Sequence, residues 1–281
     1  MIFSGKSGTL MEKESKEMEL AMNIPESIRN RIGTYTVSSE GIGMSGAQVY
    51  YVNDMVLKIE PPDRESDNSL TMLRWLDGRL PVPKVLEAVD GDEGRYLLMS
   101  RIPGSMACAP EYMADPQSLV RLLSEGMGML WAVDTRDCPC DCRLERKLSW
   151  ARYRVEHGLV DLDNVEPETF GENGFSSPEA LLRWLEQNQP EEEPVLSHGD
   201  YCLPNVFLKN GTVSGFLDLG RCGIADRYQD IALCWRSLRD NFNGRYGYLD
   251  PGFDPDVLFD ALDIRPDWAK IRYYLLLDEL F

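Results

Sequence analysis

The sequence lacks a long apolar segment and is short of positive charge. No run of 18 or more apolar residues occurs, so we expect no membrane-spanning helix. The first ten residues have no apolar stretch ahead of a cleavage site, which argues against a secretory signal peptide. Only 29 Lys and Arg face 47 Asp and Glu, giving a net charge of −18. Such a chain repels nucleic acids and anionic membranes and attracts cationic partners, although an acidic surface can also serve solubility alone.

Side chains of the kind that bind zinc are also scarce. The only histidines are His157 and His198, and the seven cysteines are odd in number and do not have the spacing of a disulfide framework. Cys138, Cys140 and Cys142 form a C-x-C-x-C run, but two histidines supply a closed zinc site poorly. We therefore expect free thiols in a reducing cytoplasm.

The periodicity of apolar residues changes along the chain. After a polar leader or loose helix at 1–33, alternating residues predict short strands. Beyond Pro103 and Gly104, which suit a hinge, apolar residues recur at helical spacing. The expected strands lie at 34–39, 48–52, 54–60, 96–100, 206–208 and 213–217, and the expected helices at 70–76, 118–133, 143–157, 178–189, 230–240 and 268–280. A strand-rich part at 34–101 thus precedes a helix-rich part at 102–281.

A glycine-rich segment stands between the first two expected strands. Residues 41–46, Gly-Ile-Gly-Met-Ser-Gly, fit the pattern G-x-G-x-x-G. A dinucleotide-binding turn requires a helix after the glycines, whereas here a strand follows. This order favours a hairpin that folds over nucleotide phosphates, with a plain hairpin turn as the alternative. We assign nucleotide contacts to Gly43, Ser45, Ser100 and the strand lysine Lys58, which would neutralise the α- and β-phosphates.

The strongest local motif is the segment 197–205, Ser-His-Gly-Asp-Tyr-Cys-Leu-Pro-Asn. Asp200 and Asn205 have the spacing of the aspartate and asparagine in a kinase catalytic loop. Asp200 would accept the proton of the attacking hydroxyl, and Asn205 would offer an oxygen to Mg²⁺. Asp218 follows in an Asp-x-Gly turn after an expected strand and is the second candidate ligand of Mg²⁺.

These motifs occur in the order that protein kinases use: glycine hairpin, strand lysine, Asp–Asn loop and metal-binding aspartate. We therefore predict an α+β, two-lobed, protein-kinase-like fold with a small β-rich N-terminal lobe and a larger helical C-terminal lobe. The nucleotide would lie between the lobes, and the reaction would be transfer of a phosphate from ATP.

At these residues the sequence resembles the aminoglycoside 3'-phosphotransferase family over nearly everything from Thr34 to Phe281. The most specific segments are LPVPKVLEA at 80–88, VLSHGDYCLPNVFLKNGTVSGFLDLGRCGIADRYQDIA at 195–232 and KIRYYLLLDELF at 270–281. The resemblance implies that ATP and Mg²⁺ are used to phosphorylate the 3'-hydroxyl of antibiotics such as kanamycin and neomycin, which would confer resistance.

The resemblance also implies where the cationic drug binds. The segment 157–195 holds ten Asp or Glu and one basic residue, Arg183. In the family, acids of this insert and of the C-terminal tail bind the ammonium groups of the drug. The matching candidates are Glu166, Glu168, Asp278, Glu279 and the carboxylate of Phe281, with a solvated acidic loop as the alternative for the insert. Arg221 and Asp230 match positions that brace the catalytic loop or balance its charge.

Two positions depart from the family pattern. The helix glutamate that pairs with the strand lysine in kinases is replaced by Ser69, with Glu65 and Asp67 nearby and Asp67 the better placed. The family often has an aromatic residue two positions before the lysine, stacked on adenine, where this chain has Val56. Weaker stacking would loosen ATP or admit GTP.

Two other functions remain open on this reading. A kinase of the same fold could act on another small hydroxylated molecule, choline-like or a macrolide, with the same Asp200, Asn205 and Asp218. The acidic insert argues against an uncharged substrate. A nucleotide-binding protein with little catalysis is supported only by Ser69 and Val56.

Overall fold

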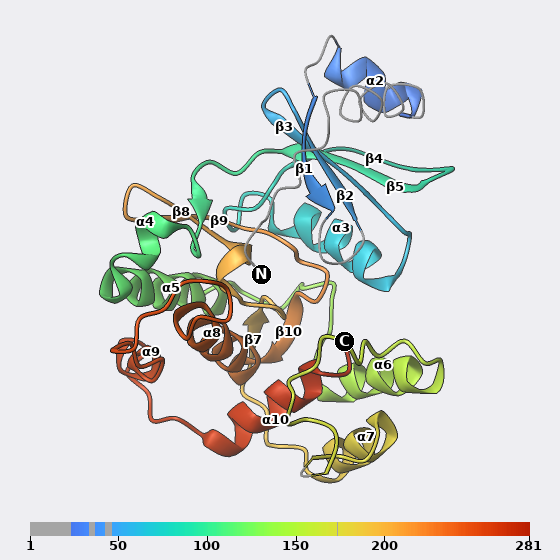
Figure 1. Ribbon diagram of the computed structural model, residues 1–281. Helices are drawn as coiled ribbons and strands as arrows, with labels where there is room; N and C mark the ends of the chain where they lie inside the picture. Colours follow the sequence, from blue (N-terminus) through green and yellow to red (C-terminus); the bar gives the residue numbers. More distant parts are fainter. Residues whose placement is uncertain (1–23, 34–36, 43–46, 173) are drawn as a thin grey trace.

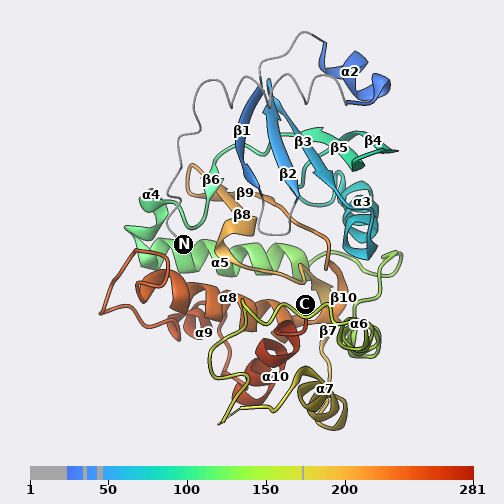
Figure 2. The same cartoon turned by 45° about the vertical axis from the view of Figure 1, so that its right-hand side comes forward.

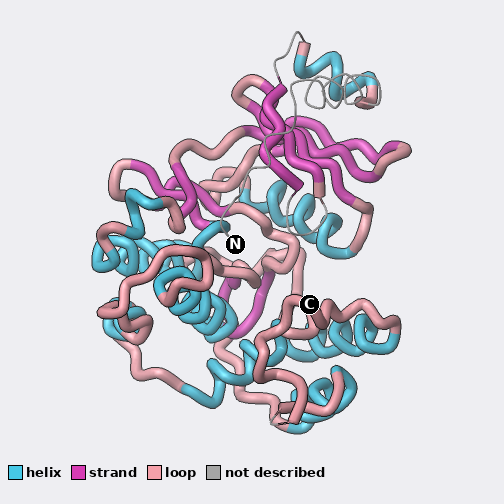
Figure 3. Tube along the Cα trace, viewed as in Figure 1, coloured by secondary structure: helices cyan, strands magenta, loops and turns pink. Residues whose placement is uncertain are grey.

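The computed structural model describes residues 24–33, 37–42, 47–172 and 174–281. Figure 1 shows two lobes, with a sheet and two helices in the upper one and most of the helices in the lower one. The larger sheet lies in the upper lobe and most of the helices lie in the lower lobe in Figure 3, so the predicted two-lobed α+β fold is confirmed. Within the described residues, no helix has the length and apolar character needed to cross a membrane.

The N-terminal lobe is built on a five-stranded antiparallel sheet in the order β1-β2-β3-β5-β4. Its strands are β1 (Val37–Ile42), β2 (Gln48–Val52), β3 (Met55–Glu60), β4 (Val85–Gly91) and β5 (Gly94–Ser100). Its helices are α2 (Glu26–Ile32) and α3 (Arg64–Leu76). Strand β5 lies between β3 and β4, and six of its seven residues are buried.

Side chains of the central strands alternate between the two faces of this sheet, and a different helix covers each face. Leu98 of β5 packs with Leu57 of β3 and with apolar residues of α2. Leu97 of the same strand belongs instead to the main core with Leu73 of α3. Because side chains of a strand alternate between faces, α2 and α3 cover opposite sides of the sheet. Lys58 stands opposite Leu97 in register and therefore lies on the α3 side.

The C-terminal lobe combines helices with two small sheets. Its helices are α4 (Pro110–Met113), α5 (Pro116–Trp131), α6 (Leu144–Glu156), α7 (Pro178–Gln187), α8 (Arg227–Phe242), α9 (Val257–Ala261) and α10 (Trp268–Asp278). Its strands are β6 (Ser105–Met106), β7 (Pro194–Ser197), β8 (Val206–Lys209), β9 (Thr212–Phe216) and β10 (Gly223–Asp226), with a 3₁₀ turn at Leu203–Asn205. Strands β6, β8 and β9 form one sheet, and β7 and β10 the other. Figure 2 shows α5 and α8 beneath the first of these sheets.

Helix α8 is central to this lobe because it is buried on nearly every side. Its buried residues include Ile231, Leu238 and Phe242, which belong to the main hydrophobic core. The helix contacts β7, β10, α5 and α10. The strand that leads into the predicted catalytic loop and the tail of the chain are therefore both held against one rigid helix.

The predicted helices of the C-terminal lobe are confirmed, although several boundaries differ. Helix α8 begins at Arg227 because the Asp226 side chain accepts a hydrogen bond from Tyr228 N. Helix α3 begins six residues earlier than predicted, because Asp63 and Ser66 form a reciprocal capping box. The apolar pattern of the sequence did not predict strands β4, β6, β7 and β10 or helices α4 and α9. The expected strand at 34–39 lies at β1, and 34–36 are outside the described residues, as are residues 1–23 of the leader.

Candidate active site

Asp230, at the start of α8, holds the predicted catalytic loop by three hydrogen bonds. Its carboxylate accepts from Ser197 Oγ at 2.9 Å, from His198 N at 2.8 Å and from Gly199 N at 3.0 Å. Gly199 has φ of +85°, and a Cβ there would lie 1.9 Å from the carbonyl oxygen of Arg221. Only glycine fits this close approach. The backbone before Asp200 is thus fixed from two directions, and the expected bracing by Asp230 is confirmed.

Asn205 orients the carboxylate of Asp200. Its Nδ2 donates to Asp200 Oδ2 at 2.9 Å and to the Asp200 carbonyl at 3.0 Å. Within the described part of the chain, Asn205 Oδ1 has no hydrogen-bond partner. The amide therefore uses its donor for Asp200 and keeps its acceptor for another group.

Asp218 lies beside Asn205 because strands β8 and β9 pair. Leu217 N donates to the Asn205 carbonyl at 2.9 Å, next to the paired residues Val206 and Phe216. Asp218 has φ of +56°, and its carboxylate is 52% exposed. Few residues besides glycine adopt this left-handed conformation, although aspartate tolerates it. The backbone turn thus presents an accessible carboxylate next to the Asp200–Asn205 pair.

Lys58 reaches the same place from the N-terminal lobe. Its Nζ lies 3.8 Å from Asp218 Oδ1 and 2.6 Å from Glu60 Oε2 on its own strand. Burial by itself lowers the pKa of Lys58, but Asp218 and Glu60 outweigh burial and raise the pKa above its ordinary value. The ammonium therefore stays charged. The structure brings Lys58, Asp200, Asn205 and Asp218 together as the sequence predicted.

The prediction that Asp67 of α3 is the better-placed partner of Lys58 was wrong. Asp67 instead accepts a hydrogen bond of 2.6 Å from Arg95 Nη1 on β5. Glu65 points toward the other lobe and accepts from Arg221 Nε at 3.0 Å. Ser69 is buried. The sequence could not show this, because neither Arg95 nor Arg221 is near α3 along the chain.

Arginines surround the acids next to Asp200. Burial raises the pKa of Asp200, Arg221 opposes this shift, and Asp278 and Asp218 add to it. Arg221 Nη1 donates to Asp278 Oδ1 at 3.1 Å, and Arg236 Nη2 donates to Asp278 Oδ2. Burial alone would raise the pKa of Asp278, but Arg236 and Arg221 lower it. The two guanidiniums therefore keep Asp278 ionised close to the Asp200 carboxylate, whose pKa burial raises.

The predicted drug-binding acids are paired with arginines or exposed. Glu166 lies 3.3 Å from Arg239 Nη2 and 2.5 Å from Arg245 Nη1. Glu279 is buried, accepts from Glu166 N at 2.9 Å and lies 3.4 Å from Arg236. The pairing arginines belong to α8 and the loop after it, and sequence reasoning did not include them.

Glu168 of the insert and Phe281 at the end of the tail have different surroundings. Glu168 is exposed and makes no ion pair with any described residue. The Phe281 ring lies 5.3 Å from the Arg221 guanidinium, 5.8 Å from that of Arg154 and 5.9 Å from Lys147 Nζ. Arg154 Nε also donates to the Leu280 carbonyl at 2.7 Å. Cations therefore hold the last residues of the chain from several sides.

The other predicted nucleotide contacts are less well defined. Gly43 and Ser45 lie outside the described residues. Strand β2 does follow the glycines and pairs with β1 through Ile42 and Gln48, which is the hairpin order rather than a dinucleotide-binding turn. Ser100 ends β5, and both its N–H and its hydroxyl bond to backbone atoms of Lys84 at 2.9 Å.

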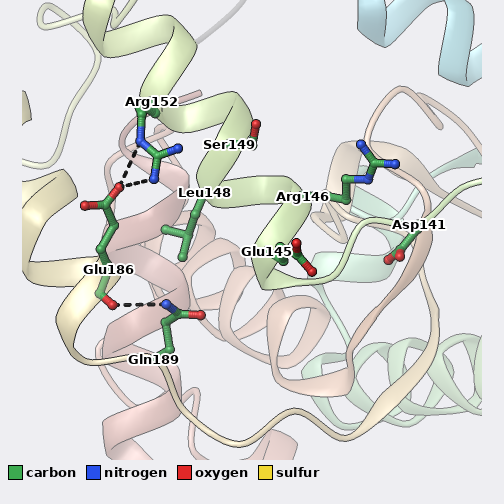
Figure 4. Close-up of a pocket in the computed structure, with 8 residues that line it drawn as sticks. All are labelled: Asp141, Glu145, Arg146, Leu148, Ser149, Arg152, Glu186 and Gln189. Carbon is green, nitrogen blue, oxygen red and sulfur yellow. Dashed lines mark hydrogen bonds and ion pairs between the residues drawn. The ribbon is translucent and has the colours of Figure 1, made fainter.

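A hollow elsewhere on the surface contains none of these residues. It measures about 840 Å³ and is lined by polar side chains of α6, α7 and their flanking loops. Figure 4 shows Arg152 paired with Glu186 across it, and Gln189 bonded to the Glu186 backbone. Arg152, Glu186 and Gln189 bond to one another, and the hollow holds none of the motif residues, so the Asp200 array remains the candidate site.

The oxygen atoms near Asp218 fit a magnesium ion. Asn205 offers a free amide oxygen, and Asp218 offers an exposed carboxylate. Mg²⁺ prefers such oxygen ligands and usually takes only one or two from protein, with phosphate and water completing its shell. The described residues contain no group of three or more His, Cys, Asp or Glu that could hold a metal alone. The seven cysteines, all described, are free thiols.

Comparison with known proteins agrees with this geometry. The phosphotransferase enzyme family matches residues 41–274. An aminoglycoside 3'-phosphotransferase from Enterococcus faecalis is 38% identical, with 92% of this chain and 99% of the relative covered. One from Staphylococcus aureus is 37% identical over the same shares.

Solved structures of aminoglycoside phosphotransferases are also similar to this chain. An aminoglycoside-3'-phosphotransferase of type VIII is 30% identical with a TM-score of 0.75, covering 91% of this chain and 97% of that one. An aminoglycoside phosphotransferase from Streptomyces rimosus, in complex with ADP and streptomycin, is 26% identical with a TM-score of 0.74, covering 90% and 95%. The chain therefore belongs to the phosphotransferase enzyme family and, within it, to the aminoglycoside 3'-phosphotransferases.

Proposed function

We propose that this enzyme transfers the γ-phosphate of ATP to the 3'-hydroxyl of an aminoglycoside antibiotic, with Mg²⁺, and so confers resistance. The observation that carries the proposal is the joined array in which Asn205 Nδ2 lies 2.9 Å from Asp200 Oδ2 and Lys58 Nζ lies 3.8 Å from Asp218 Oδ1. ATP and the reducing conditions that keep cysteines as thiols both belong to the cytoplasm, where we place the enzyme.

Asp200 would act as the general base. One carboxylate oxygen accepts the proton of the 3'-hydroxyl while the hydroxyl oxygen bonds to the γ-phosphorus. The bond from that phosphorus to the bridging oxygen breaks, and its electron pair leaves with ADP. Asn205 Nδ2 fixes which carboxylate oxygen remains free for the hydroxyl. Burial raises the pKa of Asp200, which makes its carboxylate a better proton acceptor than an exposed aspartate.

The nucleotide end of the site would be held by Lys58 and the glycine hairpin. Lys58 would neutralise the α- and β-phosphates, with Gly43, Ser45 and Ser100 as further contacts. Asp218 and Asn205 Oδ1 would hold Mg²⁺, which when bound supplies positive charge to the phosphate oxygens. Val56, half-buried on β3, leaves a floor without an aromatic ring, so GTP is an alternative donor. Equal rates with ATP and GTP would support that alternative.

The drug end would be formed by Glu166, Glu168, Asp278, Glu279 and the Phe281 carboxylate. An aminoglycoside carries several ammonium groups, which would replace arginine contacts on Glu166, Asp278 and Glu279 and would reach Glu168 and the chain-end carboxylate directly. Because Glu166, Asp278 and Glu279 already have arginine counter-charges, the attraction of the drug to these three acids depends on its fit to them rather than on a bare negative surface.

The proposal can be tested with two aminoglycosides that differ only in the 3'-hydroxyl. The purified enzyme, ATP and Mg²⁺ would be assayed with kanamycin and with an otherwise identical 3'-deoxy analogue, and ADP release would be measured. We expect turnover with kanamycin and none with the analogue. Equal turnover with both drugs would place the phosphate on another hydroxyl. Turnover of a macrolide or choline but not of kanamycin would favour the other small-molecule kinase.

A further inference from the structure

We infer that Glu60 is the positioning residue of Lys58 and replaces the glutamate that the neighbouring helix supplies in kinases. The inference rests on the proposed function in one respect, namely that Lys58 binds the nucleotide phosphates. It goes beyond that function because Glu60 lies outside the catalytic motifs and on the same strand as the lysine.

The acids at the start of α3 are all engaged elsewhere. Asp63 caps the helix by accepting from Ser66 N at 2.8 Å. Glu65 bonds to Arg221, and Asp67 bonds to Arg95. One turn further along, the buried residue on the sheet side of the helix is Ser69, which cannot carry charge. Asp63 attracts Lys58 from a distance, but no acid of helix α3 forms an ion pair with it.

Glu60 is placed to serve instead. Residues two apart on a strand project from the same face, so Glu60 and Lys58 both lie on the α3 side of the sheet. Their side chains are only 11% and 16% exposed, and the Nζ–Oε2 distance is 2.6 Å. Among the described residues, this is the only ion pair that Glu60 makes.

A nearby arginine, Arg95, is placed to pair with Glu60 but pairs with other acids instead. Arg95 stands directly opposite Glu60 in register on β5. Its guanidinium is instead occupied by Asp67 at 2.6 Å and by Asp90 at 2.9 Å. Asp67 and Asp90 thus satisfy Arg95 and leave Glu60 to the lysine.

The ion pair between Lys58 and Glu60 contributes little to the stability of the fold. Glu60 Oε1 is buried and has no hydrogen-bond partner among the residues that the structure describes. A buried acceptor without a donor costs stability, and a buried ion pair adds little in return. A half-satisfied carboxylate at this position is better explained by what it does for Lys58 than by what it does for the fold.

The first test is Glu60→Gln, which keeps shape and removes charge. We expect kcat/KM for ATP to fall roughly 10- to 100-fold because the ammonium is no longer fixed toward the phosphates. The KM for the aminoglycoside and the melting temperature should hardly change. The matched control is Glu87→Gln on β4, whose carboxylate pairs with Arg31 at 3.2 Å and should leave ATP kinetics unchanged.

The second test moves the charge back to the helix. Ser69 is buried one helical turn before Leu73, which packs in one core with Leu97, the residue opposite Lys58. The variant that combines Glu60→Gln with Ser69→Glu should therefore recover part of the lost kcat/KM for ATP. A purely structural role for Glu60 predicts no such rescue. An unchanged kcat/KM for ATP in the single variant, or no rescue in a folded double variant, would overturn the inference.

A third variant separates this inference from the proposed function. Lys58→Met should remove nearly all activity if the lysine binds the phosphates. If Lys58→Met is inactive while Glu60→Gln is normal, the function stands and the role of Glu60 is rejected. If Lys58→Met is fully active, the phosphate role of the lysine is itself rejected.

Discussion

Arg221 Nη1 donates a hydrogen bond of 3.1 Å to Asp278 Oδ1, which joins the loop after β9 to the last residue of α10. The same guanidinium bonds to Glu65 of α3 at 3.0 Å, 156 residues away in sequence. One side chain thus links the N-terminal lobe, the turn that carries Asp218 and the C-terminal tail. The tail is part of the internal structure of the site as well as a candidate surface for the drug.

Replacing Asp278 with Asn should therefore destabilise the fold. Arg221 and Arg236 would lose the carboxylate between them, and breaking a buried pair from one side costs roughly 3 kcal/mol in the free energy of unfolding. Chemical denaturation would measure it. The control is Asp134→Asn, whose exposed pair with Arg136 should contribute nothing measurable. A variant as stable as the wild type would show that Asp278 is not needed to balance the two arginines.

Removing the last four residues would be a less informative experiment. Leu280 is fully buried, so the truncation would also open the core. Point substitutions in the tail separate drug binding from folding more cleanly.

Glu279 predicts a pH dependence of stability. Burial raises the pKa of its carboxyl to about 7 from an ordinary value of 4.5, against the lowering effect of the Glu166 N–H bond. Because the folded-state pKa is the higher one, the stabilising contribution of Glu279 is fully present below about pH 4.5 and is lost as the pH rises through 7.

Melting temperatures at pH 5 and pH 8 would test this for the wild type and Glu279→Gln. Glutamine still accepts from Glu166 N but does not titrate, so the wild type should lose more stability than the variant between the two pH values. Equal changes in both proteins would contradict the assigned pKa.

Asp200→Asn should lower turnover by about 100-fold or more and leave nucleotide affinity largely unchanged. Asparagine can still accept from Asn205 Nδ2 but cannot take the proton of the hydroxyl. Steady-state kinetics and a separate measurement of ADP binding would be compared. Near-normal turnover would exclude Asp200 as the base.

Asp218→Ala should abolish activity that depends on magnesium, because the candidate site loses its carboxylate ligand. The matched control is Asp260→Ala, at an exposed position of α9. Activity would be titrated with Mg²⁺ in both variants and the wild type. An unchanged magnesium dependence in Asp218→Ala would remove that residue from the site.

The catalytic array could be predicted from sequence because its members follow one another closely. Asp200 and Asn205 are five residues apart, and Asp218 follows one hairpin later. The local spacing therefore predicted that these three residues lie close together, without knowledge of the tertiary fold. The bracing of Gly199 by Asp230 was expected from the resemblance for the same segment.

The partners of the acids could not be predicted in this way. The pairs Glu65–Arg221 and Glu166–Arg245 join residues 156 and 79 positions apart. Charge balance between distant segments depends on how the lobes and helices pack, which no local pattern contains. The same is true of Arg95, which holds Asp67 away from Lys58 only because β5 lies beside β3.

The pairing of Lys58 with Glu60 bears on how this resistance enzyme could be inhibited. Both residues belong to one strand, so a compound that pushed α3 outward would leave the ammonium beside its carboxylate. Inhibitors designed to work by displacing that helix would therefore spare the nucleotide-binding lysine. Compounds that enter between strand β3 and the Asp218 turn would meet the lysine directly, and they offer the better route to restoring sensitivity to the drug.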